Sequence, residues 1–362
     1  QKCEYLIMAW FDASWSYRAL LTVDNTKVGG DLTNFPVYLD LSQAGSSHGL
    51  WTSVKSDGGD IRITKSDGTT EVARELVVID TTGKTGEVHF KADGTLSGSS
   101  DTDYYIYYGN AAASDHAETA TYGQHNVWDS NHKAVWHLQE AAAESIKDSP
   151  SNSVDEGTAT STATDVDGKV ERGFDFNGSS NGVVFDGTSA STNLKQTGNL
   201  QFEMWFNADT IGQDVLWSNF LNSTNVGTGF WFWNSNFRAQ IGSSGWTNLT
   251  YATTNFSTGT WYYVVANWDG SDYKLYVDGV ERDTGAYTGT QTYSGTQSIL
   301  GNRAGGDDFD GQMDEVRFHS TARSANWIST TYNMINAPAT FITWGAEEED
   351  TPSFIPRSSI II

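Results

Sequence analysis

The sequence has little cysteine, proline or positive charge, and it has no long apolar run. Its single cysteine, Cys3, excludes an internal disulfide and any zinc site built from cysteines. With 5 prolines against 36 glycines, turns must be made mainly by glycine. No stretch approaches the roughly 18 apolar residues of a membrane span. The start, QKCEYLIMAWF, lacks the charged and apolar regions of a signal peptide, so either a leader has been removed or the secretory route is not used.

The chain has only 21 basic residues and 45 acidic ones, which gives a formal net charge of −24. Such a surface repels phosphate backbones and anionic lipids, which argues against nucleic acid and membrane as partners. It favours solubility in salt and attraction of divalent cations. The acidity alone does not distinguish a cation-binding protein from one that is merely well solvated.

Aromatic residues and strand-like alternation are abundant. The chain has 14 Trp, 16 Tyr and 17 Phe among 362 residues, enough for two cores. Apolar residues alternate with period two, which is typical of strands, and the runs are separated by glycine turns. In the first part these runs are YRALLTV, FPVYLDL, DIRITKS, ELVVID, GEVHFKA and DYYIYYGN. We therefore predict an all-β chain of two antiparallel β-sandwich domains that meet near residue 128.

The second part continues the same pattern after two unusual segments. Residues 111–126 indicate a short helix or a connector, and the low-complexity residues 139–168 indicate a functional or disordered loop. Strands then resume with GFDFNG, GVVFDG and NLQFEMWFNAD, followed by the hairpin WYYVVANWDGSDYKLYVDGVERD. We find no helical repeat.

Both parts resemble known families. The order WFDASWSYRALLTV, SDGGDIRITKSDGTTEVARELV, GEVHFKA and DTDYYIYYGN resembles an uncharacterised β-domain family that precedes laminin-G-like domains. The later motifs FDFNGSSNGVVF, LQFEMWFNA and LGNRAGGDDFDGQMDEVRFHSTARSANWI resemble a laminin-G-like, concanavalin A-like jelly roll. The resemblance implies an N-terminal extension (1–8), a β-sandwich (about 9–128), a jelly roll (about 129–348) and a tail (349–362).

Two adjacent acids lie in the strand-like run GQMDEVRFHS. In a regular strand, Asp314 would share a face with Val316 and Phe318, whereas Glu315 would share the other with Arg317. Two acids on opposite faces cannot flank one glycosidic bond. The E-x-D-x-E pattern that the resemblance implies for glycosidases of this fold is absent. We expect Glu315 and Arg317 to form a surface pair of little energetic value.

The resemblance implies a different role for Asp314. In laminin-G-like domains the Asp of this G-x-x-D-E-V motif helps to hold a structural calcium ion. The matching second acid is Asp148 in KDSPSN, and Asn152 could add a carbonyl oxygen. Oxygen ligands of this kind suit Ca²⁺. The alternative is that Asp314 accepts hydrogen bonds from loop amides without a metal.

Aromatic residues supply the candidate ligand site. In GFWFWNSNF, Phe230 and Phe232 face one way while Trp231 and Trp233 face the other, so one pair must lie outside the core. Lectins of the fold that the resemblance implies stack sugar rings on such aromatic platforms. Trp246 is a third candidate. The alternative is that a loop or the neighbouring domain covers this face.

The other motifs in the sequence do not indicate a catalytic or metal-binding site. The seven histidines show no H-x-x-x-H or H-E-x-x-H spacing, and we expect His137 in AVWHLQE to be a packed strand residue. No G-x-S-x-G nucleophile motif is present.

We therefore predict a non-catalytic virion protein, such as a tail or capsid fibre or decoration, that displays a glycan-binding jelly roll at the virion surface. The alternative is a secreted or cell-surface glycan-binding adhesin, and a glycoside hydrolase is a distant third. The predicted partners are a glycan or cell-surface receptor. The apolar tail DTPSFIPRSSIII is expected to dock onto another copy or a larger particle.

Overall fold

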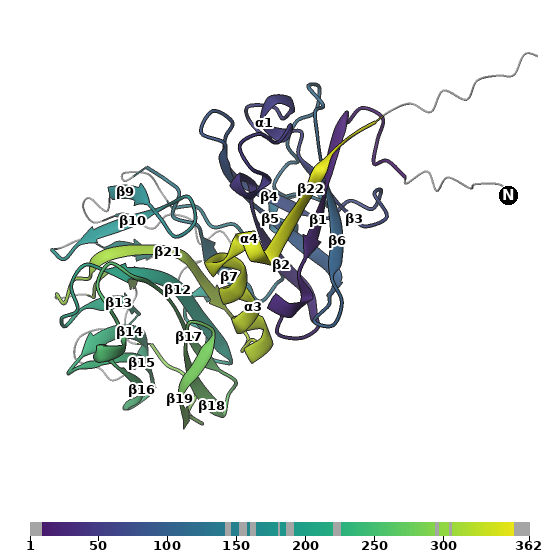
Figure 1. The fold of residues 1–362 in the computed structure, drawn as a ribbon. Helices are drawn as coiled ribbons and strands as arrows, with labels where there is room; N and C mark the ends of the chain where they lie inside the picture. Colours follow the sequence, from purple (N-terminus) through teal and green to yellow (C-terminus); the bar gives the residue numbers. More distant parts are fainter. Residues whose placement is uncertain are drawn as a thin grey trace, which may run out of the picture.

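The computed structural model describes residues 9–141, 146–151, 158–159, 164–179, 182–185, 192–219, 226–293, 297–303 and 306–350. These residues form two β-rich lobes, with the C-terminal helices between them (Figure 1). Every named strand pair is antiparallel, which confirms the all-β prediction. Within the described part of the chain, no helix is both long and apolar enough to cross a membrane.

The N-terminal lobe contains two sheets, in the orders β22-β1-β6-β3 and β2-β5-β4. Its strands, apart from β22, are β1 (Tyr17–Val23), β2 (Leu32–Asp40), β3 (Arg62–Lys65), β4 (Arg74–Asp80), β5 (Thr85–Leu96) and β6 (Thr102–Tyr108). The short helices here are η1 (Asn25–Lys27), η2 (Leu41–Ala44), α1 (Leu50–Ser53) and η3 (Gln124–Asn126). Residues 111–123 form turns and extended chain, so the segment is a connector that ends in η3.

The second lobe is a jelly roll of two larger sheets, ordered β19-β18-β17-β12-β21-β10-β9 with β7 on β21, and β16-β15-β14-β13-β20-β11-β8. The strands of the first sheet are β7 (His132–Trp136), β9 (Thr164–Asp167), β10 (Arg172–Asn177), β12 (Leu200–Ala208), β17 (Trp261–Trp268), β18 (Asp272–Val277), β19 (Val280–Ala286) and β21 (Asp310–His319). Those of the second are β8 (Thr158–Ala159), β11 (Val183–Phe185), β13 (Val215–Ser218), β14 (Gly227–Trp233), β15 (Asn236–Gly242), β16 (Trp246–Ala252) and β20 (Ser298–Leu300), with η4 (Thr253–Asn255) after β16.

The core of the jelly roll follows the predicted alternation. Leu200, Phe202, Met204 and Phe206 on β12 are buried in one cluster between the two sheets. The turn between β18 and β19 also matches its sequence, because Asp278 and Gly279 both have positive φ, at 54° and 75°. Such a turn matches the twist of the flanking strands.

The chain end does not belong to the jelly roll, contrary to the predicted boundary at residue 348. After β21, α3 (Ala325–Asn336) and α4 (Pro338–Phe341) lead to β22 (Ile342–Glu349), which pairs with β1 from Val23↔Ile342 to Tyr17↔Glu349. Figure 1 shows β22 running beside β1 in the N-terminal lobe. The N-terminal sandwich is therefore closed by residues more than 300 positions downstream of its first strand.

The two lobes share one apolar cluster. Trp205, Tyr263, Val265 and Tyr276, on the outer face of the first jelly-roll sheet, pack in the same cluster as the N-terminal core and α3. The N-terminal lobe thus covers this sheet, and the outer face of the second sheet, which carries β14 to β16, lies on the opposite side of the jelly roll.

Candidate functional site

The strand that carries the two adjacent acids contains a β-bulge. On β12, Glu203 and Trp205 are two residues apart, but their partners on β21, Arg317 and Asp314, are three residues apart. β21 therefore contains one extra residue at this point. Glu315 lies within the bulge and has a φ of 49°. Met313, Val316 and Phe318 consequently face the jelly-roll core. The prediction that Asp314 shares a face with Val316 and Phe318 is therefore wrong. Both acids lie on the buried face toward the N-terminal lobe.

Asp314 is fully buried, and its carboxylate accepts hydrogen bonds from the backbone N–H groups of Val170 and Glu315, each at 2.7 Å. Burial, and then the charge of Glu315, raise the pKa of Asp314 well above its usual value. Asp148 is also buried and accepts a hydrogen bond from the Val135 N–H at 2.8 Å. Asn152 lies outside the described residues. These contacts give no support to a calcium ion shared by the two acids, which stays a prediction.

Glu315 and Arg317 do form an ion pair, but the prediction that it lies at the surface is wrong. The two residues are 1% and 2% exposed. Arg317 also lies 3.6 Å from Glu203, whose carboxylate accepts a hydrogen bond from the Tyr263 hydroxyl. Burial opposes ionisation of Glu315, but the nearby charges of His137 and Arg317 lower its pKa overall. The pair is a buried charge network at the junction of the lobes.

Four residues of this junction converge to form what we call the junction cluster: Glu87, His89, His137 and Glu315. Glu87 and His89 are two residues apart on β5, so they project from one face. His137 follows β7, whose Trp136 pairs with Val316, and it contacts Glu315 directly. All four side chains are buried. Burial raises the pKa of Glu87 to about 8.

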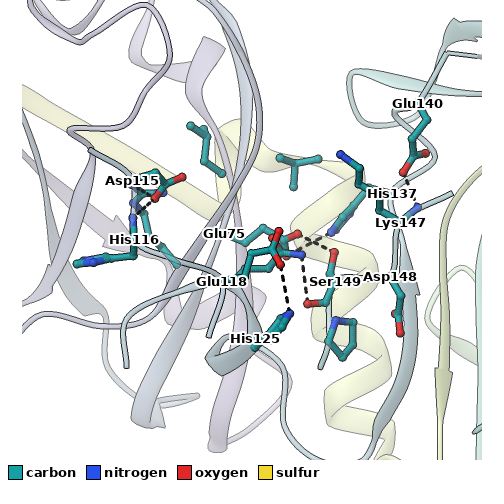
Figure 2. A pocket seen from close by; sticks show the side chains of 15 residues that line it. Glu75, Asp115, His116, Glu118, His125, His137, Glu140, Lys147, Asp148 and Ser149 are labelled. Atoms are coloured by element: carbon teal, nitrogen blue, oxygen red, sulfur yellow. Dashed lines mark hydrogen bonds and ion pairs between the residues drawn. The ribbon is translucent and has the colours of Figure 1, made fainter. Parts of the chain in front are cut away.

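A pocket of about 600 Å³ opens beside the junction cluster. Three segments line it: Arg74 to Val77 on β4, connector residues between Asp115 and His125, and residues between His137 and Pro150. Its wall contains five acids against one arginine and one lysine, so it attracts cations. Figure 2 shows Glu75 beside His137 and Ser149, and the Ser149 hydroxyl donates to Glu75 at 2.6 Å. His137 therefore belongs both to the pocket wall and to the junction cluster.

Two further histidines, outside the junction cluster, are buried next to each other. The rings of His132 and His319 lie 4.5 Å apart between Asp129, Arg323 and Glu203. Burial, and then the charge of His319, lower the pKa of His132 to about 3, and burial also lowers the pKa of His319. The His132 ring is therefore neutral in the folded protein at neutral pH.

This arrangement predicts acid sensitivity. In the unfolded chain, His132 binds a proton as pH falls below about 6.5, whereas the folded chain resists protonation until about 3. The contribution of His132 to stability should therefore fall with pH through this window, by up to about 1.4 kcal/mol per pH unit. The pair of Asp129 with Arg323 and the charge of Glu203 should be lost only below about pH 4. The raised pKa values of His137, Glu87 and Asp314 act in the opposite direction, because the folded chain holds protons that the unfolded chain has lost. The slope of the wild type combines all of these groups, and a variant isolates the part that His132 contributes.

Urea unfolding at pH 7, 6 and 5 measures this slope. We expect His132→Asn, which keeps a polar atom near Nδ1, to remove the His132 contribution and so to change the slope by up to about 1.4 kcal/mol per pH unit. The matched control is His125→Asn, at a partly exposed pocket histidine, which should leave the slope unchanged. Equal slopes in the wild type and in His132→Asn would contradict the assignment.

The tryptophans of β14 lie as the alternation predicts. Phe230 and Phe232 are fully buried in the core, whereas Trp231 and Trp233 are partly exposed on the outer face of the second sheet. The two indoles stack with ring centroids 5.1 Å apart and an interplanar angle of 28°. The guanidinium of Arg303 lies over Trp231 at 5.8 Å. The result is a stacked, partly exposed indole pair beside a cationic group.

Trp246 shares this face but lies apart from the pair. Gly227 on β14 pairs with Gly242 on β15, which pairs in turn with Trp246 on β16. Trp246 therefore lies two strands away from β14, at the level of Gly227, which is four residues before Trp231. Strand geometry puts this separation at about 16 Å. A single sugar ring could not contact both, although an extended chain of sugars could.

Sequence reasoning missed the junction cluster altogether. His137 is buried as predicted, but it follows β7 instead of lying in it, and its ring nitrogen faces two carboxyl groups. The one usable signal was the E-x-H spacing of Glu87 and His89, because that spacing puts two side chains on one strand face.

The comparisons with known proteins concern the jelly roll. Residues 177–329 match the family model of the concanavalin A-like lectin/glucanases superfamily, which confirms the predicted resemblance of the second part of the chain. No curated protein matches the chain. Among solved structures, domain 4 of the extracellular arabinanase AbnA from Geobacillus stearothermophilus, in complex with arabinotriose, is 20% identical, with a TM-score of 0.45, over 55% of this chain and 97% of that chain.

Two botulinum neurotoxin domains are also among the solved structures that match. The serotype D ligand-binding domain, in complex with N-acetylneuraminic acid, is 12% identical, with a TM-score of 0.45, over 56% of this chain and 50% of that chain. The serotype G binding domain is 11% identical, with a TM-score of 0.44 and the same coverage. The present chain spans about half the length of these neurotoxin domains.

Proposed function

We propose that this concanavalin A-like domain is a non-catalytic glycan-binding module whose ligand stacks on Trp231 and Trp233. The observation that carries the proposal is the stacked, partly exposed indole pair on the open sheet. Indoles combine a large apolar face with a polar N–H, which suits the apolar face and hydroxyl rim of a sugar ring. The N-terminal lobe packs on the other sheet, which leaves this face of the jelly roll outside the contact between the lobes.

The burial of the β21 acids supports a binding role over a hydrolytic one. A glycosidase needs two carboxyl groups that flank an accessible glycosidic bond. Asp314 and Glu315 are 0% and 1% exposed and are engaged by backbone amides, His137 and Arg317. They cannot reach a bound sugar without opening the junction of the lobes.

Two settings suit such a module, and we propose the virion surface first. A tail or capsid fibre or decoration would use the glycan as its receptor and would dock through residues 349–362, most of which lie outside the described residues. A secreted or cell-surface adhesin is the alternative. Neighbouring genes for portal or capsid proteins would favour the first setting, and an upstream signal sequence in the gene would favour the second.

Replacing both platform tryptophans tests the binding role. We expect Trp231→Ala/Trp233→Ala to weaken glycan binding by about 30-fold or more, since loss of an aromatic hot spot costs about 2 kcal/mol or more. A glycan array followed by calorimetry with the strongest hit measures this. Because each indole is more than half covered, the variant should also lose some stability, so circular dichroism must confirm that it is folded at the temperature of the binding measurement.

Trp246→Ala is the matched control, at a tryptophan on the same sheet face about 16 Å away by strand geometry. It should bind a short glycan as the wild type does. Wild-type binding by the double variant would exclude the platform. Running the array with Ca²⁺ and with chelator also tests the predicted calcium ion.

A further inference from the structure

The junction cluster has the donor set and spacing of a transition-metal site. Four possible ligand atoms, one each from Glu87, His89, His137 and Glu315, lie within 4.8 Å of one another. The Glu87 Oε1 lies 2.7 Å from His89 Nε2 and 3.0 Å from His137 Nδ1. In a tetrahedral Zn²⁺ site with bonds of about 2.1 Å, neighbouring ligand atoms are about 3.4 Å apart. Small side-chain shifts would therefore admit an ion.

Outer partners already orient the two carboxylates. Gln139 donates to the second oxygen of Glu87 at 3.0 Å, and Arg317 pairs with the second oxygen of Glu315. Glu75 lies 3.6 Å from Nε2 of His137, opposite the nitrogen that faces the cluster. A carboxylate behind a histidine is the usual support for a metal-binding imidazole. In three of the four residues, the oxygen or nitrogen that would not bind the ion thus has a polar or charged neighbour.

Charge and access favour a cation here. Glu87 and Glu315 bring two carboxyl groups into a buried region, and one imidazole nitrogen, Nδ1 of His137, faces both of them. One N–H cannot donate well to two acceptors, whereas one dication can bind all the groups. The acidic pocket reaches the cluster through His137 and supplies an entry path.

We propose that Glu87, His89, His137 and Glu315 bind a first-row transition-metal dication, for which Zn²⁺ is the natural probe. Two imidazoles and two carboxylates suit Zn²⁺ and neighbouring metals, whereas Ca²⁺ prefers oxygen ligands alone. The ion would tie β5 of the N-terminal lobe to β7 and β21 of the jelly roll. It would be a structural bond between lobes, separate from the tryptophan platform.

The direct test uses the tag-free full chain, stripped with chelator and titrated with Zn²⁺. We expect one tightly held Zn²⁺ per chain by elemental analysis after dialysis, a higher melting temperature, and no comparable response to Ca²⁺. With ¹⁵N-labelled histidine, the ring signals of two of the seven histidines should shift on binding. This readout needs no variant and therefore does not depend on the folding of one.

Variants assign the site. Glu87→Gln and His89→Gln should each abolish the Zn²⁺-dependent rise in melting temperature. His125→Gln, at a pocket histidine outside the cluster, should retain it. No stoichiometric Zn²⁺ on the wild type, shifts in histidines other than His89 and His137, or an unchanged response in both cluster variants would each overturn the proposal.

Discussion

Arg317→Met should lower the free energy of unfolding by about 3–5 kcal/mol, because it leaves buried carboxylates without their counter-charge. The guanidinium is fully enclosed, pairs with Glu315, lies 3.6 Å from Glu203 and sits over the Trp128 ring at 5.4 Å. Methionine fills much of the same space, so the loss of stability would come from removal of the charge and not from a cavity. Urea unfolding of the metal-free protein at pH 7 measures it.

Lys274→Met provides the matched control. Lys274 and Glu281 form an ion pair at 3.2 Å whose side chains are 33% and 38% exposed. Exposed pairs contribute about 0–1 kcal/mol, so this variant should be nearly neutral. An equally small loss of stability in Arg317→Met would contradict the prediction, because it would mean that water or another group compensates the buried carboxylates. The burial of Glu203 and Glu315 argues against such compensation.

The sequence was informative where strands are regular. In β14 an uninterrupted two-residue period correctly separated Phe230 and Phe232 from Trp231 and Trp233. In β21 the same rule failed, because one extra residue at Glu315 reverses the alternation beyond it. Nothing in GQMDEVRFHS marks that bulge, since Glu315 adopts a positive φ without being glycine or asparagine.

The contact between the two lobes was not predicted from the sequence at all. Trp205 and Tyr263 look like ordinary strand residues, and only the fold shows that they meet α3 and the N-terminal core. The helix itself had a readable signal: Ser324 caps it, and Trp327, Thr331 and Met334 recur on its buried face. The junction cluster joins residues as far apart in the chain as Glu87 and Glu315. Period-two patterns do not say which strands face each other.

Removing β22 should unfold the N-terminal lobe even though the strand lies at the far end of the chain. β22 pairs along the whole of β1, and it buries Ile342 while Glu348 pairs with Arg18 at 2.7 Å. A chain that ends at residue 341 would expose an apolar sheet edge and lose that entire ladder. The loss should be comparable with the roughly 5–15 kcal/mol that holds a typical domain folded. Hydrogen exchange should show β1 and β6 unprotected.

A chain that ends at residue 350 is the control, because it removes only residues outside the described part and keeps β22 intact. It should retain full protection of β1 and β6, and its oligomeric mass tests whether the tail docks onto another copy. Adding a peptide of residues 340–350 to the shorter chain should restore protection, since β-strand addition needs only a free edge and matching side chains. Protection of β1 without either the strand or the peptide would show that the lobe is stable without β22.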